Sequence, residues 1–399
     1  MILEFKVSNY MSIRKELKLS FIATSLKEST SETSEIIPLS DTGSSLLRSA
    51  VIYGANGSGK SNLLKAIELY KEFIIGSFKN SQACERINVE NFRLNVTSIK
   101  EPTMMEAIFC DSEFIYRYGF ELTDKAVNAE WLFQRYNKKY AKEIELFKRK
   151  DNEISVHPKC ELIKELVTKR MVRNNALILS TAAQFNDITS VKILTWLNDT
   201  EVLFCSKTNF LWEQVIRHLD DESMRQRIID FAKYADLGIE SISKIDNHII
   251  SNHRQYDNDG KEVNNISFTF SRNESEGTIK FFSLSYPIIK ALDNGSRLII
   301  DELDARLHPL LVQKIVSLFN SAKTNPKGAQ LLFTTHDSFL LSASLFRRDQ
   351  VLFIQKDQWG ETTSCSITDY KVRTSTPFER DYLQGRYGAI PRIGSIDNF

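Results

Sequence analysis

The sequence has few cysteines, and their arrangement builds neither a disulfide framework nor a metal cluster. Among its 399 residues there are five, at positions 84, 110, 160, 205 and 365, and no C-x-x-C pair occurs. An odd and scattered set of this kind excludes a disulfide-stapled scaffold and argues against a structural zinc site. We expect reduced cysteines that mostly serve in packing.

Long apolar runs and a net charge are lacking as well. Nowhere do about 18 apolar residues follow one another, and the start, MILEFKVSNYMSI, has no basic segment leading into a long apolar one. We therefore expect a cytoplasmic protein without a membrane partner. The formal net charge is +1, so no overall field attracts nucleic acid, and any such binding needs a local patch.

What is present is the balance of a folded chain, 42% hydrophobic and 26% charged. A chain of this length buries a sizeable core and forms two or three domains, or one domain with an insertion. Apolar periodicity near the start predicts strands and one helix. The strands are expected at 2–10, 17–23, 46–54, 104–123 and 130–136, and the helix at 61–75.

The middle of the chain has a different character. Residues 138–245 are charged, nearly free of glycine and mostly helical in period, beginning with KKYAKEIELFKRK at 138–150. This pattern predicts a helical insertion. A hairpin turned at Asp259-Gly260 is expected next, and an alternation of strands and helices resumes from about 275.

A glycine-rich bend joins a predicted strand to a predicted helix at VIYGANGSGKSNLLKAI, residues 51–67. Its sequence fills the pattern G-x-x-x-x-G-K-[ST], in which backbone N–H groups curl around phosphate oxygens. In such a loop Lys60 reaches the β- and γ-phosphates of a nucleotide, and the Ser61 hydroxyl ligates Mg²⁺. The predicted nucleotide-binding residues are Gly54, Ala55, Asn56, Gly57, Ser58, Gly59, Lys60, Ser61 and Asn62.

Two adjacent carboxylates follow another apolar strand, at RLIIDE, residues 297–302. We expect Asp301 to hold Mg²⁺ with its water shell. Glu302 points to the other side of the strand end and is the candidate to orient or deprotonate an attacking water. Taken alone the pair is typical of a solvated turn, but together with the glycine-rich loop it predicts one site for ATP and Mg²⁺.

A histidine and a capped helix complete the set. His336 ends the strand of QLLFTTHD, at the edge where ligands bind in open parallel sheets, and could contact the γ-phosphate or the attacking water. The segment NESEGTIKFFSL, residues 273–284, predicts a helix that begins near Ser275. Its hydroxyl and glycine residues form a second helix start built like an anion site.

In this order the pieces resemble the ABC-type ATPases of the SMC, RecF and OLD group. GANGSGKS corresponds to Walker A, SEGT to the signature, LIIDE to Walker B and TTHD to the switch histidine. FKVSNYMSI, NFRL, YRYGFEL and GRYGAIP look most like the small stand-alone bacterial ATPases of the RloA and PtuA kind. The resemblance covers roughly residues 1–135 and 265–399.

The resemblance implies an α/β fold, an ABC-type P-loop NTPase head with a mixed β-sheet, flanking helices and a helical insertion. The division would be an N-terminal ATPase lobe with Walker A at 1–137, the insertion at 138–245, and a C-terminal lobe at 246–399. Family members hydrolyse ATP between two heads. Ser275 and Gly277 would then contact the γ-phosphate held by the other copy, Asp304 would touch the partner head, and Glu302 and His336 would be catalytic.

The same resemblance implies a partner protein. ATPases of this kind commonly sit in antiphage or abortive-infection operons. OLD nucleases continue into a Toprim nuclease domain, whereas only about 60 residues follow the histidine here, without a cluster of spaced acidic residues. A nuclease or toxin encoded beside this chain is the expected effector, controlled by a homodimer or larger oligomer.

Two other functions stay open on the sequence. One is a nucleotide-dependent scaffold, in which ATP assembles a complex and turnover is slow. The other is a RecF-like DNA-repair ATPase, for which the support is a set of basic patches interrupted by acids, usually solvated helix faces. These patches are FKRK, KELVTKR, RHLDDESMRQR and LFRR. The glutamine of the family's Q-loop has two candidates, Gln134 and Gln184.

Overall fold

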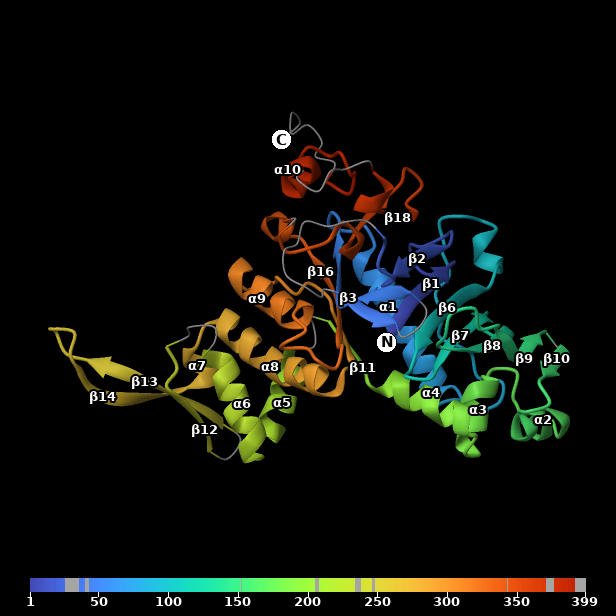
Figure 1. Ribbon diagram of the computed structural model, residues 1–399, viewed down its shortest axis with the longest axis horizontal. Helices are drawn as coiled ribbons and strands as arrows, with labels where there is room; N and C mark the ends of the chain where they lie inside the picture. The colour runs from blue at the N-terminus through green and yellow to red at the C-terminus, as the bar shows by residue number, and fades with distance from the viewer. Residues whose placement is uncertain are drawn as a thin grey trace.

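The computed structural model places two large sheets side by side, with a small lobe projecting from one of them (Figure 1). The structure describes residues 1–25, 36–39, 43–151, 153–204, 208–233, 238–245, 248–342, 344–370 and 377–391. The polar stretch rich in Ser, Thr and Glu that follows residue 23, which the sequence pattern predicts to be a loop, lies largely outside these ranges. No helix within them is long and apolar enough to cross a membrane.

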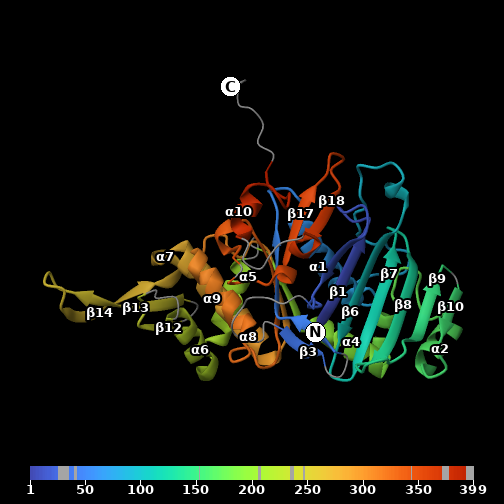
Figure 2. The ribbon, with the colours of Figure 1, turned by 45° about the horizontal axis from the view of Figure 1, so that its top comes forward.

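The first sheet is antiparallel and has seven strands in the order β10-β9-β8-β7-β6-β1-β2 (Figure 2). Its strands alternate between buried and less buried side chains, as the apolar alternation in the sequence predicts. The strands expected at 2–10 and 17–23 are present as β1 and β2, which pair as an antiparallel hairpin. The bounds are β1 Ile2–Ser8, β2 Leu17–Ser20, β6 Thr103–Cys110, β7 Phe114–Leu122, β8 Val127–Tyr136, β9 Ile144–Lys150 and β10 Glu153–Val156.

The second sheet has six strands in the order β11-β15-β16-β5-β17-β18. The five from β11 to β17 are parallel, so their carboxyl ends share one edge, and β18 pairs antiparallel with β17. Their near-continuous apolar runs fit a sheet covered on both faces. The bounds are β5 Ser49–Tyr53, β11 Thr200–Leu203, β15 Arg297–Ile300, β16 Gln330–Thr335, β17 Val351–Lys356 and β18 Thr362–Ser366.

Helix α1, Lys60–Gly76, packs between the two sheets. Ala50 and Ile52 of β5 share a core with α1 and the antiparallel sheet, whereas Val51 and Tyr53 point into the core on the other face. This period of two is what a strand buried on both sides requires. The helices α2 Glu161–Thr168, α3 Ile178–Gln184 and α4 Ile188–Asn198 also join the α1 core.

The other face of the parallel sheet is covered by α8, Glu276–Asn294, and α9, Pro309–Asn320. His308 caps α9, and Pro309 is its first residue, a position that proline favours. The carboxyl-terminal α10, Phe378–Leu383, packs on the same core. The short 3₁₀ turns are η1 Ser98–Lys100, η3 Ser338–Leu340, η4 Arg348–Gln350 and η5 Ile367–Asp369.

A small lobe with its own core lies beside α8 and ends in a long β-hairpin that projects away from the rest (Figure 1). The hairpin turns at Asp259 and Gly260, as predicted, and Gly260 has a left-handed φ of 76°. The lobe contains α5 Thr208–His218, α6 Glu222–Lys233, α7 Phe270–Asn273, β12 Ser241–Ile245, β13 His248–Tyr256 and β14 Glu262–Thr269.

The helical reading of the middle segment is partly wrong. The charged stretch that opens it forms strand β9, which pairs with β8 and β10. Phe147 and Arg149 alternate inward, and the buried Arg149 donates to the carbonyls of Ala176 and Asn174. An inward arginine disguised the period of two. Strand β11 also belongs to the parallel sheet, and the domain division 1–137, 138–245 and 246–399 stays a prediction.

The segment expected as one strand at 46–54 is divided. A short hairpin of β3, Ile36–Leu39, and β4, Ser44–Leu47, precedes β5. Between β4 and β5 the Arg48 guanidinium is buried and donates to the Asn325 carbonyl at 2.6 Å. The chain therefore changes sheets at Arg48, and only β5 enters the parallel sheet.

Candidate functional site

Three loops with polar residues meet at the carboxyl edge of the parallel sheet. Strand β5 leads into the glycine-rich loop, β15 into Asp301 and Glu302, and β16 into His336. Since β15, β16 and β5 are adjacent and parallel, their loops are neighbours in space. The sheet thus brings the glycine-rich loop next to two loops that follow it in the sequence by more than 200 residues.

The glycine-rich loop wraps around the side chain of its own lysine. Lys60 is buried, and its ammonium donates to the carbonyls of Gly54 at 2.7 Å and Ala55 at 3.2 Å. Gly59, with φ 109°, stands at the N-cap of α1, and Gly57 has φ 74°. These left-handed conformations turn the loop so that the helix starts with its N–H groups facing the cavity described next.

A cavity of about 370 Å³ opens over the loop. The Ser58 hydroxyl is buried and finds no hydrogen-bond partner among the described residues. An orphan hydroxyl beside a lysine and a helix start suits an incoming anion. The lining residues are Asn56, Gly57, Ser58, Gly59, Lys60, Ser61, Asn62, Glu302, His336 and Lys356.

The acidic turn after β15 is held by a threonine from the neighbouring strand. The Thr334 hydroxyl donates to Asp301 Oδ1 at 2.6 Å and accepts from the Glu302 N–H at 2.7 Å. Asp301 is buried, and Glu302 takes a left-handed φ of 50°. At this sharp bend Glu302 is among the residues that line the cavity, whereas Asp301 is not.

Asp304 ties the acidic turn to the histidine loop. Its Oδ2 accepts from the His336 N–H at 3.2 Å, and its buried Oδ1 finds no partner among the described residues. The imidazole of His336 borders the cavity. Asp304 therefore acts here as a support for the loop that presents the histidine.

Ser275 and Gly277 stand apart from this cavity. The Ser275 hydroxyl caps α8 by accepting from the Thr278 N–H at 3.1 Å, so the predicted helix start is confirmed. A Cβ at Gly277 would come within 2.6 Å of the Arg306 carbonyl oxygen. Neither residue is among those lining the cavity of their own chain.

A protein-family model described as "AAA domain, putative AbiEii toxin, Type IV TA system" matches residues 49–342. The match runs from the first residue of β5 to beyond the histidine loop, and it covers most of the chain. The chain belongs to this AAA-domain family. No curated protein matches it at a significant level.

Solved structures similar to the chain are distant in sequence. They include the SMC head domain from Thermotoga maritima, with TM-score 0.42, 14% identity, and coverage of 92% of this chain and 98% of that chain. CbiO1 from Clostridium perfringens, part of the ABC transporter complex cbiONQ, has a TM-score of 0.35 and 12% identity, and the match covers 97% of this chain and 93% of that chain. The recombination mediator protein RecF has a TM-score of 0.31 and 13% identity, and the match covers 91% of this chain and 98% of that chain. The family assignment rests on the matched model.

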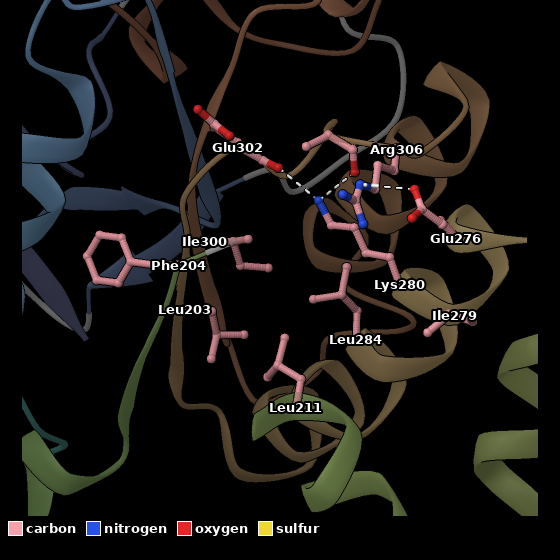
Figure 3. A pocket seen from close by; sticks show the side chains of 11 residues that line it. Leu203, Phe204, Leu211, Glu276, Ile279, Lys280, Leu284, Ile300, Glu302 and Arg306 are labelled. Atoms are coloured by element: carbon pink, nitrogen blue, oxygen red, sulfur yellow. Dashed lines mark hydrogen bonds and ion pairs between the residues drawn. The ribbon is translucent and has the colours of Figure 1, made fainter. Parts of the chain in front are cut away.

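Lys280 is a residue of the AAA domain that the sequence did not single out. Its buried ammonium donates to the carbonyls of Glu302 at 2.9 Å, Leu303 at 3.2 Å and Ala305 at 2.7 Å. Figure 3 shows it reaching from α8 to the acidic turn, beside the Glu276–Arg306 ion pair. The lysine fixes the turn that bends Glu302 relative to the helix that Ser275 caps.

A second cavity of the AAA domain, about 360 Å³, lies under the same turn (Figure 3). Glu302 lines both cavities, so it stands between the P-loop side and an apolar space beneath α8. The residues around this second cavity are Leu203, Phe204, Leu211, Glu276, Ile279, Lys280, Leu284, Ile300, Glu302, Ala305 and Arg306.

Charges around the P-loop cavity shift two titrating groups. Burial lowers the pKa of Lys60 to about 8, although Asp301, Glu302 and Asp304 oppose the shift. Desolvation and the nearby Lys60 charge lower the pKa of His336 below its ordinary value. At neutral pH the site thus presents a cationic lysine and a neutral imidazole.

Further residues that the sequence did not reveal support the loop. Lys356, at the end of β17, lines the cavity. The Thr362 hydroxyl donates to the Ser58 carbonyl at 2.9 Å, and its oxygen lies 2.7 Å from the Ser12 hydroxyl. Ser12 also accepts from the Asn62 side chain at 2.7 Å. Among these residues only Lys356 had a signal in the sequence, because it is a lysine at the carboxyl end of a strand.

Neither glutamine proposed for the Q-loop lines the cavity. Gln134 lies on β8 in the antiparallel sheet and is 3.4 Å from the Tyr116 hydroxyl, and Gln184 ends α3. The assignment of the Q-loop glutamine stays open between residues outside this site.

The residues present fit a nucleoside triphosphate with Mg²⁺. The orphan Ser58 hydroxyl, the Lys60 ammonium and the start of α1 suit the phosphates. Ser61 and Asp301 would hold the cation. In the described part of the chain no group of three or more His, Cys, Asp or Glu could bind a metal alone. Mg²⁺ takes one or two protein ligands plus phosphate and water.

Proposed function

We propose that this AAA-domain protein hydrolyses ATP with Mg²⁺ at the P-loop cavity. The observation that carries the proposal is the meeting of Lys60, Glu302 and His336 around one cavity at the carboxyl edge of the parallel sheet. Positioning and charge neutralisation supply most of the catalysis in phosphoryl transfer, and these residues offer both.

Each residue has a distinct role in the proposed reaction. Lys60 would leave the carbonyls of Gly54 and Ala55 to pair with the β- and γ-phosphates, and the N–H groups at the start of α1 would bind the same oxygens. Glu302, bent toward the cavity, would align the attacking water and take its proton. The neutral His336 would accept or donate a hydrogen bond near the γ-phosphate. Bound Mg²⁺ neutralises phosphate charge.

We infer that the catalytic site is completed by a second copy. Ser275 and Gly277 lie outside the cavity of their own chain. In the ABC-type group that the sequence resembles, these positions meet the γ-phosphate of the facing head. Asp304, whose buried Oδ1 has no partner among the described residues, is proposed to turn toward the partner in the closed dimer. The closed state would be favoured by ATP and relaxed by hydrolysis.

The dimer is proposed to control an effector protein, a nuclease or toxin, in antiphage defence. The support is the description of the matched family, which names a toxin of a type IV toxin–antitoxin system, together with the resemblance to stand-alone defence ATPases. Opening and closing of the heads would present or withdraw the surface that the effector binds.

ATP turnover by the purified chain with Mg²⁺ tests the catalytic proposal. Glu302→Gln is expected to lower kcat by at least a hundredfold while leaving ATP affinity nearly unchanged, because the amide cannot take a proton. Glu16→Gln, an exposed carboxylate outside the cavity, is the matched control and should behave as the wild type. Wild-type turnover in Glu302→Gln would overturn the assignment.

A further inference from the structure

A third cavity, an open cleft, lies far from the P-loop, near the carboxyl-terminal end of α1. It measures about 940 Å³, the largest volume among the cavities described above. Its walls come from the turn after α1, the β7–β8 turn, β10, the end of α2 and the segment that joins α2 to α3. The lining residues are Ala83, Cys84, Arg86, Lys125, Ile154, Val167, Arg170, Val172, Arg173, Asn174 and Asn175.

The lining is strongly positive in a chain whose net charge is +1. It includes four cationic side chains and, within the described part of the chain, no carboxylate. The side chain of Arg86 is 80% exposed, and its ion pair with Asp124 spans 3.6 Å at the surface. A pair so exposed contributes little and leaves the guanidinium available. Lys125 and Arg170 are exposed as well.

The cleft is preformed by hydrogen bonds to its floor. Arg173 donates to the carbonyls of Ser77 at 3.2 Å and Phe78 at 2.8 Å, just past the end of α1. Its buried Nε finds no partner among the described residues. The Asn175 amide donates to the carbonyls of Gln82 and Glu85. These bonds hold the backbone of the floor in place, so a ligand would meet a cleft whose shape is already set, which lowers the entropy cost of binding.

One wall is apolar. Ile154, Val167 and Val172 are partly buried against the α1 core and contribute their remaining surface to the cleft. The exposed Asn174 beside them offers an amide donor and acceptor. An apolar wall, an amide and several cations are the features that a base, its polar edge and its phosphates require.

We propose that this cleft binds a phosphate-bearing nucleotide ligand, separately from the ATP of the P-loop. Arg86, Lys125 and Arg170 hold the phosphates, since guanidinium groups match phosphate oxygens bidentately. The base lies against Val167 and Val172. The volume suits a ligand the size of a dinucleotide, at the upper end of common small-molecule pockets.

Cys84 makes the cleft directly testable, because it is exposed and lies in the lining. The full chain carries Lys60→Ala, so that binding at the P-loop is removed. The probe is 5′-phosphorylated diadenylate, and the readout is the rate of iodoacetamide labelling of Cys84, followed by mass spectrometry of its peptide. The probe is expected to slow labelling at least fivefold, and raising the salt concentration should weaken this protection.

Paired charge removals then locate the site. Arg86→Ala with Arg170→Ala is expected to raise the Kd for diadenylate at least tenfold in calorimetry. Lys159→Ala with Lys164→Ala removes the same charge from exposed positions nearby that do not line the cleft, and it should change the Kd less than twofold. If both double variants raised the Kd equally, binding would depend only on general surface charge, and the proposal would be overturned.

Two competing anions decide the ligand class. Tripolyphosphate lacks a base, and hexaglutamate represents an acidic peptide. Both are expected to protect Cys84 far less than diadenylate at equal concentration. If tripolyphosphate protects as well as diadenylate, the apolar wall has no role, and if hexaglutamate protects better, the cleft is a peptide site. Either result, or the absence of protection by diadenylate at millimolar concentration, contradicts the nucleotide assignment.

Discussion

At the scale of single residues, the buried lysine of the P-loop predicts how pH acts on nucleotide binding. In the free protein burial lowers the pKa of Lys60 to about 8. Bound phosphates would stabilise the ammonium and raise that pKa again, so above pH 8 binding takes up a proton. ATP affinity should be steady just below pH 8 and fall as pH rises beyond it, by up to about tenfold per pH unit.

Calorimetric Kd values for ATP between pH 7.5 and 9.5 check this dependence. Lys60→Arg keeps its charge over the whole range, so its weaker binding should show no comparable slope. A wild-type affinity that stays flat to pH 9.5 would mean that the phosphates do not meet Lys60.

A second residue-scale prediction concerns Lys280. Lys280→Met leaves the carbonyls of Glu302, Leu303 and Ala305 without their charged donor. We expect the free energy of unfolding to drop by about 2–4 kcal/mol in urea titrations. Lys290→Met, on the same helix but forming only a partly exposed ion pair of 3.8 Å with Glu201, should cost under about 1 kcal/mol. Similar losses for the two variants would show that the turn is held by other contacts.

At the scale of elements, a substitution at the start of α8 can separate the structural role of Ser275 from its proposed role at the interface of a dimer. Ser275→Asp keeps a good N-cap, because a carboxylate also accepts from the Thr278 N–H and suits the helix dipole. Its charge, however, would repel a γ-phosphate held by the facing copy. We expect an unfolding free energy within about 0.5 kcal/mol of the parent and no ATP-induced dimer.

Light scattering checks the dimer prediction by measuring the mass of two proteins, Glu302→Gln and the double variant that also carries Ser275→Asp. Each is measured with and without ATP. Ser366→Asp places the same charge at another capping serine, on η5, and serves as the matched control. An ATP-dependent dimer that survives Ser275→Asp would remove the serine from the proposed seam.

At the scale of the whole molecule, the parts that the sequence predicts share one feature. Each is marked by a short run of residues whose types and spacing are tied to the proposed chemistry. The P-loop, the acidic turn and the cap of α8 each follow from residue type and spacing over a few positions. Strand β9 was misread because its inward Arg149 finds carbonyl partners some 25 residues away. Lys280, Thr334 and Thr362 act through long-range contacts, which no local pattern reports.

The β13–β14 hairpin yields the last prediction, since it projects from the small lobe with most of β14 exposed (Figure 2). The core of that lobe includes Ile249 at the base of β13 and no residue of β14. Replacing residues 256–263 by Asn-Gly closes Gln255 and Asn264, which already pair, with a two-residue turn. We expect the Tm to stay within about 2 °C, because little apolar surface is lost.

Ile249→Ala is the contrasting change at the base of the same hairpin. It removes a buried side chain and should lower the free energy of unfolding by about 2–4 kcal/mol. Calorimetric scans of both variants, together with ATP turnover, show whether the projecting tip of the β13–β14 hairpin contributes to folding or to catalysis. A shortened hairpin that keeps its Tm and its turnover would show that the projecting tip serves neither folding nor ATP hydrolysis. A fall in Tm as large as that of Ile249→Ala would instead make the tip part of the folding unit.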